Sequence, residues 1–192
     1  MSDILAHLPP DEPLPRGIYG DGAGVTFKTI ALALATLVAG RDADALSAAF
    51  QSGFGAALPQ GPEAVTAGGI TVIGTGPGRW TVAAEDIGGD DLLQRLQSLA
   101  GPYGAVTDQS DASVVFEVSG PKACETLTKM LLIDIDAGVF KPGHAATTQA
   151  ALIGTTLWRT GEAYRFLIAR SYALAFVRAL SVSAAEFGFE FA

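Results

Sequence analysis

A pattern of strand end, turn and helix start occurs twice in this sequence, about eighty residues apart, and limits the folds that the chain can adopt. Residues 37–43 have the pattern of a strand end, a glycine turn and a helix start, with Asp42 as a favourable N-cap. Residues 117–123 repeat this plan, with Pro121 suited to the first helical turn. Apolar or small residues then follow at helical spacing: Leu46, Ala49, Phe50, Gly53, Phe54 and Ala57 in the first copy, and Cys124, Leu127 and Leu131 in the second.

Each of these helices is followed by a predicted hairpin and a second helix. Residues 70–82 alternate as two strands around the glycine cluster 74–78, and residues 152–168 alternate around 160–162. The faces predicted to be buried carry Trp80, Val82 and Ala84 in the first hairpin and Tyr164, Phe166 and Ile168 in the second. Each half therefore has the order strand, helix, two or three strands, helix. This is an α+β pattern of the ferredoxin-like type.

The second helix of each half has its own boundary signals. The first runs from about residue 90 to 100, where Gly101 and Pro102 are stop signals. The second begins near Ser171, ends before Gly188, and is predicted to bury Tyr172, Ala175, Phe176, Ala179 and Leu180.

These patterns divide the chain into three segments. Residues 1–24 are acidic and rich in proline, and are predicted to be a tail that is mobile or lies along a partner. Residues 25–104 form the first α+β half and residues 105–192 the second, within one structural unit.

Charge and composition narrow the class of protein. The formal net charge of −8, without any basic run, argues against nucleic acid as a partner. The residues are 49% hydrophobic and only 17% charged, which favours an apolar surface for a partner protein. Such a chain is expected to self-associate when isolated. Cys124 is the single cysteine, so neither an internal disulfide nor a cysteine-based metal cluster can form.

The most apolar run does not predict a membrane span. Residues 29–39 are far shorter than the roughly 20 residues that cross a bilayer. The segment before them carries Asp3, Asp11, Glu12 and Asp21, which does not fit the basic start of a signal peptide. We expect a cytoplasmic protein.

The glycine cluster 74–79 is the most prominent candidate site. Phosphate and coenzyme A loops use glycines so that backbone N–H groups can approach an anion at a helix N-terminus. Residues 80–84, however, alternate like a strand, so no helix dipole would face a ligand. A hairpin turn is favoured over an anion cradle, and a strand at this point removes the interpretation as an acyl-coenzyme A transferase.

Acidic residues offer two further candidates. Asp134 and Asp136 are two residues apart, on one face if the segment is extended, where a solvated face is favoured over acid–base work. Asp108, Ser110 and Asp111 precede a strand at 114–118, where turn and cap hydrogen bonds are the favoured role.

The remaining candidates do not form a recognisable constellation. His7 lies in the predicted tail, and His144 is interpreted as a loop residue or a polar contact to a partner. Cys124 is interpreted as packing on its helix. Arg170 could clamp a carboxylate, but a surface salt bridge is favoured, with Ser171 as an N-cap. We predict no catalytic, cofactor-binding or metal-ligating residues in this chain.

Short blocks in a fixed order resemble those of the gamma subunits of heterotetrameric sarcosine oxidases. The blocks are residues 37–42, 55–59, 76–80, 107–110, 118–123, 132–135, 140–143, 157–159 and 170–173, and together they span about 25–188. The chain departs from the family at Gly78 and Arg79, where acidic residues are common, and at 38–40, where Leu-Arg-Gly is common.

The resemblance implies a fold and a role. It implies a duplicated α+β architecture similar to the folate-binding module of the glycine-cleavage T protein. It also implies a small companion subunit without a cofactor. Its partners would be alpha and beta subunits, which hold FAD, FMN, NAD and the tetrahydrofolate site and oxidise sarcosine, and a delta subunit. Two alternatives stay open: a gamma-type subunit of a related N-methyl amino acid dehydrogenase, and a stand-alone folate-binding protein of one-carbon transfer.

Overall fold

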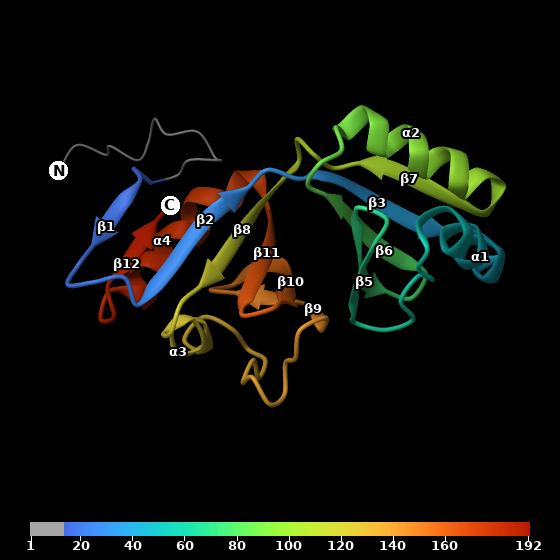
Figure 1. Ribbon diagram of the computed structural model, residues 1–192. Coiled ribbons are helices and arrows are strands. Elements are labelled where there is room, and N and C mark those ends of the chain that lie inside the picture. The colour runs from blue at the N-terminus through green and yellow to red at the C-terminus, as the bar shows by residue number, and fades with distance from the viewer. Residues whose placement is uncertain (1–13) are drawn as a thin grey trace. The chain divides into compact units, whose positions relative to one another are not determined.

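The computed structural model describes residues 14–192, which form an α+β protein with two β-sheets (Figure 1). The first part of the chain contains β1 (Gly17–Tyr19), β2 (Val25–Ile30), β3 (Ala33–Ala39), α1 (Ala43–Phe54), β4 (Ala64–Ala67), β5 (Ile70–Gly76), β6 (Arg79–Ala84) and α2 (Gly89–Ala100). A 3-10 turn, η2 (Gly101–Tyr103), leads to β7 (Gly104–Asp108), β8 (Ser113–Ser119), α3 (Ala123–Thr128), β9 (Ala145–Ala150), β10 (Ile153–Thr160) and β11 (Ala163–Ala169). The chain closes with η3 (Arg170–Tyr172), α4 (Ala173–Ala184) and β12 (Phe189–Phe191).

The element order repeats along the chain. The series β2-β3-α1-β4-β5-β6-α2 recurs as β7-β8-α3-β9-β10-β11-α4. This repetition confirms the duplicated α+β fold predicted from the sequence.

One compact unit comprises residues 31–113 and 143–147. Its five-stranded sheet has the order β4-β5-β6-β3-β7. Apolar side chains of α1 and α2 share a core with this sheet, and include Leu37, Leu46, Phe50, Trp80, Leu92 and Leu96. Helix α1 begins where predicted, because the Asp42 carboxylate accepts a hydrogen bond from the Ala45 N–H at 2.9 Å.

The other compact unit comprises residues 14–30 together with 114–142 and 148–192. Its seven-stranded sheet has the order β1-β12-β2-β8-β11-β10-β9. Phe176 of α4 packs against Phe116 and Phe166 of the sheet, with ring centroids 5.4 and 5.3 Å away. These rings form an aromatic core under α4.

The two sheets exchange the first strand of each repeat. Strand β2 pairs antiparallel with β8, with Thr26 opposite Ser119 and Ile30 opposite Val115. Strand β3, which follows β2 directly, pairs antiparallel with β7 in the other sheet. The compact units therefore do not coincide with the predicted halves 25–104 and 105–192, because each half contributes its first strand to the other sheet.

Part of the predicted tail is a strand. Within 1–24, residues 17–19 form β1, which pairs antiparallel with β12 at the sheet edge. The Tyr19 ring stacks on Phe189 with 4.8 Å between centroids. Aromatic stacking thus accompanies the backbone ladder that joins this segment to the C-terminal strand.

The burial predicted for the last helix is confirmed at Phe176 and Leu180 and is wrong at Tyr172 and Ala175, which are exposed. Its first turn is the 3-10 turn η3, and the buried stripe of α4 is Ala173, Phe176, Val177, Leu180 and Ala184. Tyr172 is 55% exposed. The cap predicted at Ser171 was also wrong, since the residue lies inside η3 and neither η3 nor α4 has a side-chain cap.

Candidate functional site

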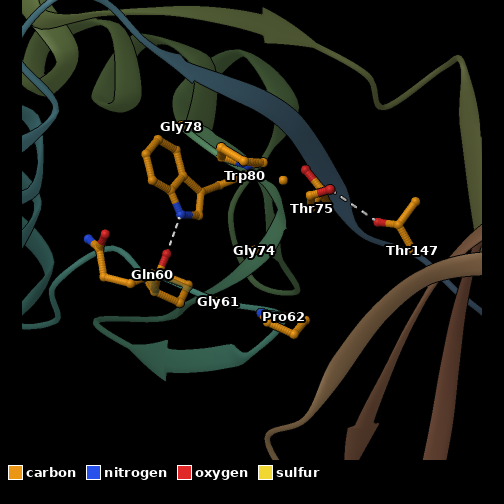
Figure 2. Close-up of a pocket in the computed structure, with 11 residues that line it drawn as sticks. Gln60, Gly61, Pro62, Gly74, Thr75, Gly78, Trp80 and Thr147 are labelled. Atoms are coloured by element: carbon orange, nitrogen blue, oxygen red, sulfur yellow. Dashed lines mark hydrogen bonds between the residues drawn. The ribbon is translucent and has the colours of Figure 1, made fainter.

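A pocket of about 500 Å³ lies beside the β5–β6 hairpin (Figure 2). Its lining comes from the loop after α1, from the hairpin turn and from the start of β9. The lining residues are Pro59, Gln60, Gly61, Pro62, Gly74, Thr75, Gly76, Pro77, Gly78, Trp80 and Thr147.

Glycine lets the loop and the hairpin lie against each other. A Cβ at Gly74 would clash with the carbonyl oxygen of Gly61. The pairing of β5 with β6 is irregular between Gly74 and Gly76, and the Gly74 N–H donates to the Glu63 carbonyl at 2.9 Å. The close approach of two backbones therefore requires glycine at position 74.

Hydrogen bonds hold the pocket wall in place. The buried Trp80 indole N–H donates to the Pro59 carbonyl oxygen at 2.8 Å, and the Thr147 hydroxyl donates to the Thr75 carbonyl oxygen at 3.4 Å (Figure 2). Trp80 is only 4% exposed and fixes the loop through its indole. The wall of the pocket is therefore formed by backbone, proline rings and the Trp80 indole.

The side chains that line this pocket can support few kinds of chemistry. None of its lining residues has a titratable side chain, so they cannot transfer protons or neutralise a charged ligand. The glycine cluster ends at Gly78, which has a φ of +62°, and strand β6 follows. This confirms the hairpin turn predicted for residues 74–79. A helix N-terminus that could bind phosphate does not follow it.

Asp108 and Ser110 form a local hydrogen-bond cluster, as predicted. The Asp108 carboxylate accepts from the Ser110 N–H at 2.9 Å and from its hydroxyl at 2.7 Å. These donors lower the pKa of Asp108 below its ordinary value. The Leu34 N–H donates to the Ser110 hydroxyl at 3.0 Å, so the cluster joins the β7–β8 connection to β3.

Asp134 and Asp136 also make local contacts. The Asp134 carboxylate accepts from the Asp136 N–H at 2.9 Å, and the Asp136 carboxylate accepts from the Gly138 N–H at 2.8 Å. Both aspartates are exposed, and the segment is an irregular loop instead of a strand. Their side chains shape successive turns.

The other sequence candidates are dispersed. His144 is exposed and lies opposite Glu63 in an isolated antiparallel bridge. Cys124 is partly buried on α3, with its Sγ 3.8 Å from the Ile135 carbonyl oxygen. Arg170 is half-buried in η3. His7 lies outside the described residues.

Metal-ligand clusters and membrane helices are both missing from the part of the chain that the structure describes. Across residues 14–192, no three His, Cys, Asp or Glu side chains gather closely enough to hold a metal. Within the same range, no helix is long and apolar enough to cross a bilayer.

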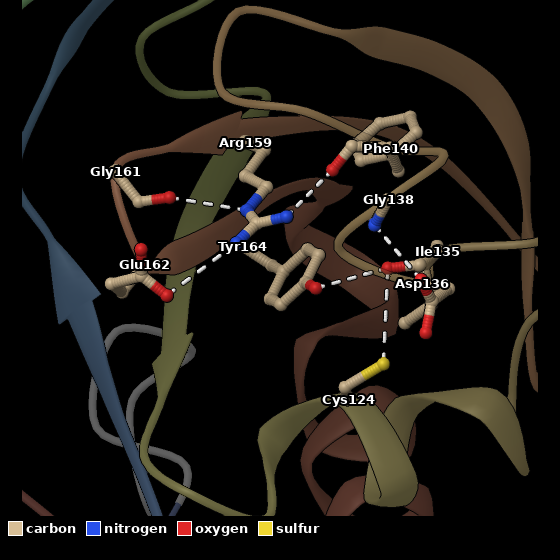
Figure 3. A network of polar contacts seen from close by, with 9 residues as sticks. All are labelled: Cys124, Ile135, Asp136, Gly138, Phe140, Arg159, Gly161, Glu162 and Tyr164. Atoms are coloured by element: carbon tan, nitrogen blue, oxygen red, sulfur yellow. Dashed lines mark hydrogen bonds and ion pairs between the residues drawn. The ribbon is translucent and has the colours of Figure 1, made fainter.

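The polar network with the most buried charge was not predicted from the sequence. Arg159 of β10 is 6% exposed; its guanidinium donates to the carbonyl oxygens of Phe140 at 2.8 Å and Gly161 at 3.1 Å (Figure 3). It also lies over the Tyr164 ring, 5.4 Å from the centroid. Its signal in the sequence was an arginine inside an otherwise uncharged strand.

Tyr164 extends this network to the loop before β9. Its hydroxyl donates to the Ile135 carbonyl oxygen at 3.1 Å. Burial raises the pKa of Tyr164 above its ordinary value, which widens the pH range in which the hydroxyl is protonated and able to donate. Arg159 and Tyr164 thus hold the loop 131–142 at two carbonyl groups and act as structural residues.

A partly buried ion-pair cluster joins three strands of the seven-stranded sheet. Glu117 of β8 accepts from Arg165 of β11 at 2.8 Å and pairs with Lys28 of β2 at 3.1 Å. Burial raises the pKa of Glu117, but hydrogen bonds and charge from Arg165 and Lys28 outweigh burial and lower it overall. The cluster links β2, which comes from the first repeat, to β8 and β11 of the second repeat.

The duplicated arrangement defines the class of protein. The structure aligns with glycine cleavage system aminomethyltransferase T from Bartonella henselae at a TM-score of 0.61 and 15% identity, over 88% of this chain and 48% of that one. This likeness shows the fold: an α+β chain with the aminomethyltransferase-like architecture.

Sequence comparison gives the particular family, although no family model matches. The chain is 34% identical over 175 residues to sarcosine oxidase subunit gamma from Arthrobacter sp, covering 89% of this chain and 85% of that one. It is 37% identical over 119 residues to the gamma subunit from Corynebacterium sp. (strain U-96), covering 62% and 56% of the two chains. The structure aligns with a chain of heterotetrameric sarcosine oxidase from Corynebacterium sp. U-96 at a TM-score of 0.77 and 30% identity, over 88% of both chains. The chain belongs to the sarcosine oxidase subunit gamma family, which confirms the resemblance predicted from its sequence.

Proposed function

We propose that this chain is the non-catalytic gamma subunit of a heterotetrameric complex of the sarcosine oxidase type. The observation that carries the proposal is the alignment, over 88% of both chains, with one chain of a heterotetrameric sarcosine oxidase. The chemistry of the pocket supports it, because its lining residues carry no titratable group. In this proposal the chain contributes surfaces, and the other subunits contribute reactive groups.

The reaction would take place in the partner subunits. By the resemblance, alpha- and beta-type chains hold FAD, FMN, NAD and tetrahydrofolate and demethylate sarcosine, and a delta-type chain completes the complex. The glycine cluster of this chain closes a hairpin, so it does not supply the glycine turn between a strand and a helix that a dinucleotide needs. We further propose a cytoplasmic location, which cell fractionation would test.

Co-expression tests the proposal. The chain is produced with and without the alpha-, beta- and delta-type products of neighbouring genes, and each complex is sized by chromatography. We expect this chain to co-elute with the other three in an active oxidase. If the other three assemble into an active enzyme that excludes it, the proposal is wrong. Sarcosine and other N-methyl amino acids as substrates then separate a sarcosine oxidase from a related dehydrogenase.

A stand-alone folate-binding protein is the second candidate. The aminomethyltransferase-like fold is the observation that favours it, but the pocket offers no carboxylate to handle a folate nitrogen. Calorimetric titration of the isolated chain with tetrahydrofolate separates the two candidates. We expect no heat of binding at micromolar concentrations, whereas micromolar binding would favour the folate carrier.

A further inference from the structure

Two exposed leucines lie on neighbouring segments at one end of the seven-stranded sheet. Leu132, which follows α3, is 79% exposed, and Leu152, in the β9–β10 turn, is 85% exposed. The backbone joins the segments: the Ala151 N–H donates to the Met130 carbonyl oxygen at 2.8 Å, and Leu131 lies opposite Ala150 in an antiparallel bridge. We call Leu132, Ala151 and Leu152 the apolar edge.

The backbone of the apolar edge has an unfavourable conformation. Ala151 has a φ of +49° and Leu152 a φ of +67°, and they are the described non-glycine residues with positive φ. A two-residue hairpin turn of this kind favours Asn or Gly, because a Cβ is strained in the left-handed region. Strain kept at an exposed apolar turn indicates selection for something other than stability.

The strand that leads into the apolar edge is uncharged, and other segments of the chain pair with its two ends: the Ala145 N–H donates to the Pro62 carbonyl oxygen at 2.7 Å, and Ala150 lies opposite Leu131. β9 is the last strand in its sheet, and residues 145–158 contain no charged side chain. Soluble proteins normally protect edge strands with charges or proline. Leu132 and Leu152 lie outside these pairings, and we expect a partner to cover these two exposed leucines in the working assembly.

Hydrogen bonds anchor the loop that contains Leu132. Arg159 and Tyr164 bind the Phe140 and Ile135 carbonyl groups of the loop that begins at Leu131 (Figure 3). A surface held in this way loses little conformational entropy when a partner binds.

The net charge of the chain indicates which kind of protein binds the apolar edge. A second copy of this chain would bring together two polypeptides that each carry a net charge of −8, which weakens the self-association expected of the isolated chain. A different chain avoids this repulsion, and the structural relative is one chain of a heterotetramer. We propose that the apolar edge is where a larger subunit of the complex docks, with an uncharged pocket that receives Leu152. This inference rests on the proposed function.

Competition for assembly tests the inference. Wild-type chain and one variant are co-expressed at equal levels with the other three subunits, and mass spectrometry measures their ratio in the purified complex. Leu152→Asn removes the apolar side chain and keeps a residue that tolerates positive φ. We expect the Leu152→Asn variant to have a melting temperature at or above that of wild type. We expect its ratio to wild type in the complex to be at least tenfold lower than in the expressed mixture.

Two control variants keep the test specific. Val182→Gln changes an equally exposed apolar residue on α4 (78% exposed) and is expected to be incorporated like wild type. Ala151→Gly relieves strain without removing Leu152, and is expected to raise the melting temperature and to be incorporated like wild type. Should Leu152→Asn lower the melting temperature, Leu152→Gly repeats the test with a residue suited to positive φ.

The outcomes separate the inference from the proposed function. If wild type is incorporated and folded Leu152→Asn is incorporated equally, the docking assignment is wrong while the subunit role stands. Equal depletion of Val182→Gln would also overturn the assignment. If wild type itself is excluded from the complex, the proposed function fails and the inference fails with it.

Discussion

At the scale of single residues, Arg159 is the clearest example of a charge used for structure. It is almost fully buried, and its hydrogen-bond acceptors are carbonyl groups of two separate loops. The exposed Glu162 carboxylate lies 3.5 Å away and adds little, because solvent screens such a pair. Arg159 therefore stabilises the loop before β9 mainly through hydrogen bonds.

Replacing Arg159 tests this role. Arg159→Met leaves the Phe140 and Gly161 carbonyl groups without their donor, and we expect a loss of about 2 kcal/mol of unfolding free energy. Urea denaturation measures the change. Arg95→Met, at an exposed position of α2, is the matched control and is expected to change stability by less than about 0.5 kcal/mol. Equal effects at both sites would contradict the role assigned to Arg159.

Glu117 predicts a pH dependence of stability. Its pKa is lowered in the folded state from an ordinary value of 4.5, so the unfolded chain binds more protons in the window below 4.5. The stabilisation by Lys28 and Arg165 is therefore present above pH 4.5 and is lost as the pH falls through the folded pKa. Asp108 contributes with the same sign.

Denaturation across the acidic range checks this assignment. We expect the unfolding free energy of wild type to fall on acidification, and that of Glu117→Gln to fall less steeply because the ion pairs no longer titrate. Parallel slopes for the two proteins would show that Glu117 has no linked proton.

At the scale of elements, the β5–β6 hairpin shows how a glycine cluster can be structural. Gly74 and Gly76 lie two residues apart in one strand, but only Gly74 faces the Gly61 carbonyl; a Cβ at Gly76 would meet nothing within 4 Å. The two positions form a matched pair for substitution.

Alanine substitutions at Gly74 and Gly76 test whether the loop and the hairpin must pack this closely. Gly74→Ala is expected to lower the unfolding free energy by about 1–3 kcal/mol, because the new Cβ forces the two backbones apart. Gly76→Ala is expected to have an effect below about 0.5 kcal/mol. Thermal and urea unfolding measure both. Tolerance of alanine at position 74 would mean that the loop moves freely.

Local signals explain which elements the sequence predicted well. Asp42 indicates α1, and the Gly-Pro-Gly turn with its alternating flanks indicates the β5–β6 hairpin, because both depend on neighbouring residues. The exchange of β2 and β7 was not predicted, since the short link at residues 31–32 carries no turn signal and strand pairing is set by distant residues. The pocket brings together residues 59–62, 74–80 and 147, whose proximity depends on the same long-range pairing.

At the scale of the whole molecule, strand exchange makes each sheet depend on both repeats. The five-stranded sheet contains β7 from the second repeat, and the seven-stranded sheet contains β2 from the first. A fragment that contains only the first repeat therefore lacks β7 of the five-stranded sheet. It keeps β2, whose pairing partners lie in the seven-stranded sheet.

Two fragments of similar length test this dependence. Residues 31–113 contain every strand of the five-stranded sheet, and we expect this fragment to unfold cooperatively on heating. Residues 25–104 lack β7 and retain β2, and we expect no cooperative transition. Cooperative unfolding of the second fragment alone would contradict the exchange.

We propose that this polypeptide assembles with catalytic subunits and carries no reactive group of its own. Native mass spectrometry of the co-purified complex, with this chain released in the gas phase, tests both parts at once. We predict one copy in each heterotetramer, released at the mass of the bare polypeptide. A chain absent from the active complex, or one released with a bound flavin, nucleotide or folate, would contradict the account.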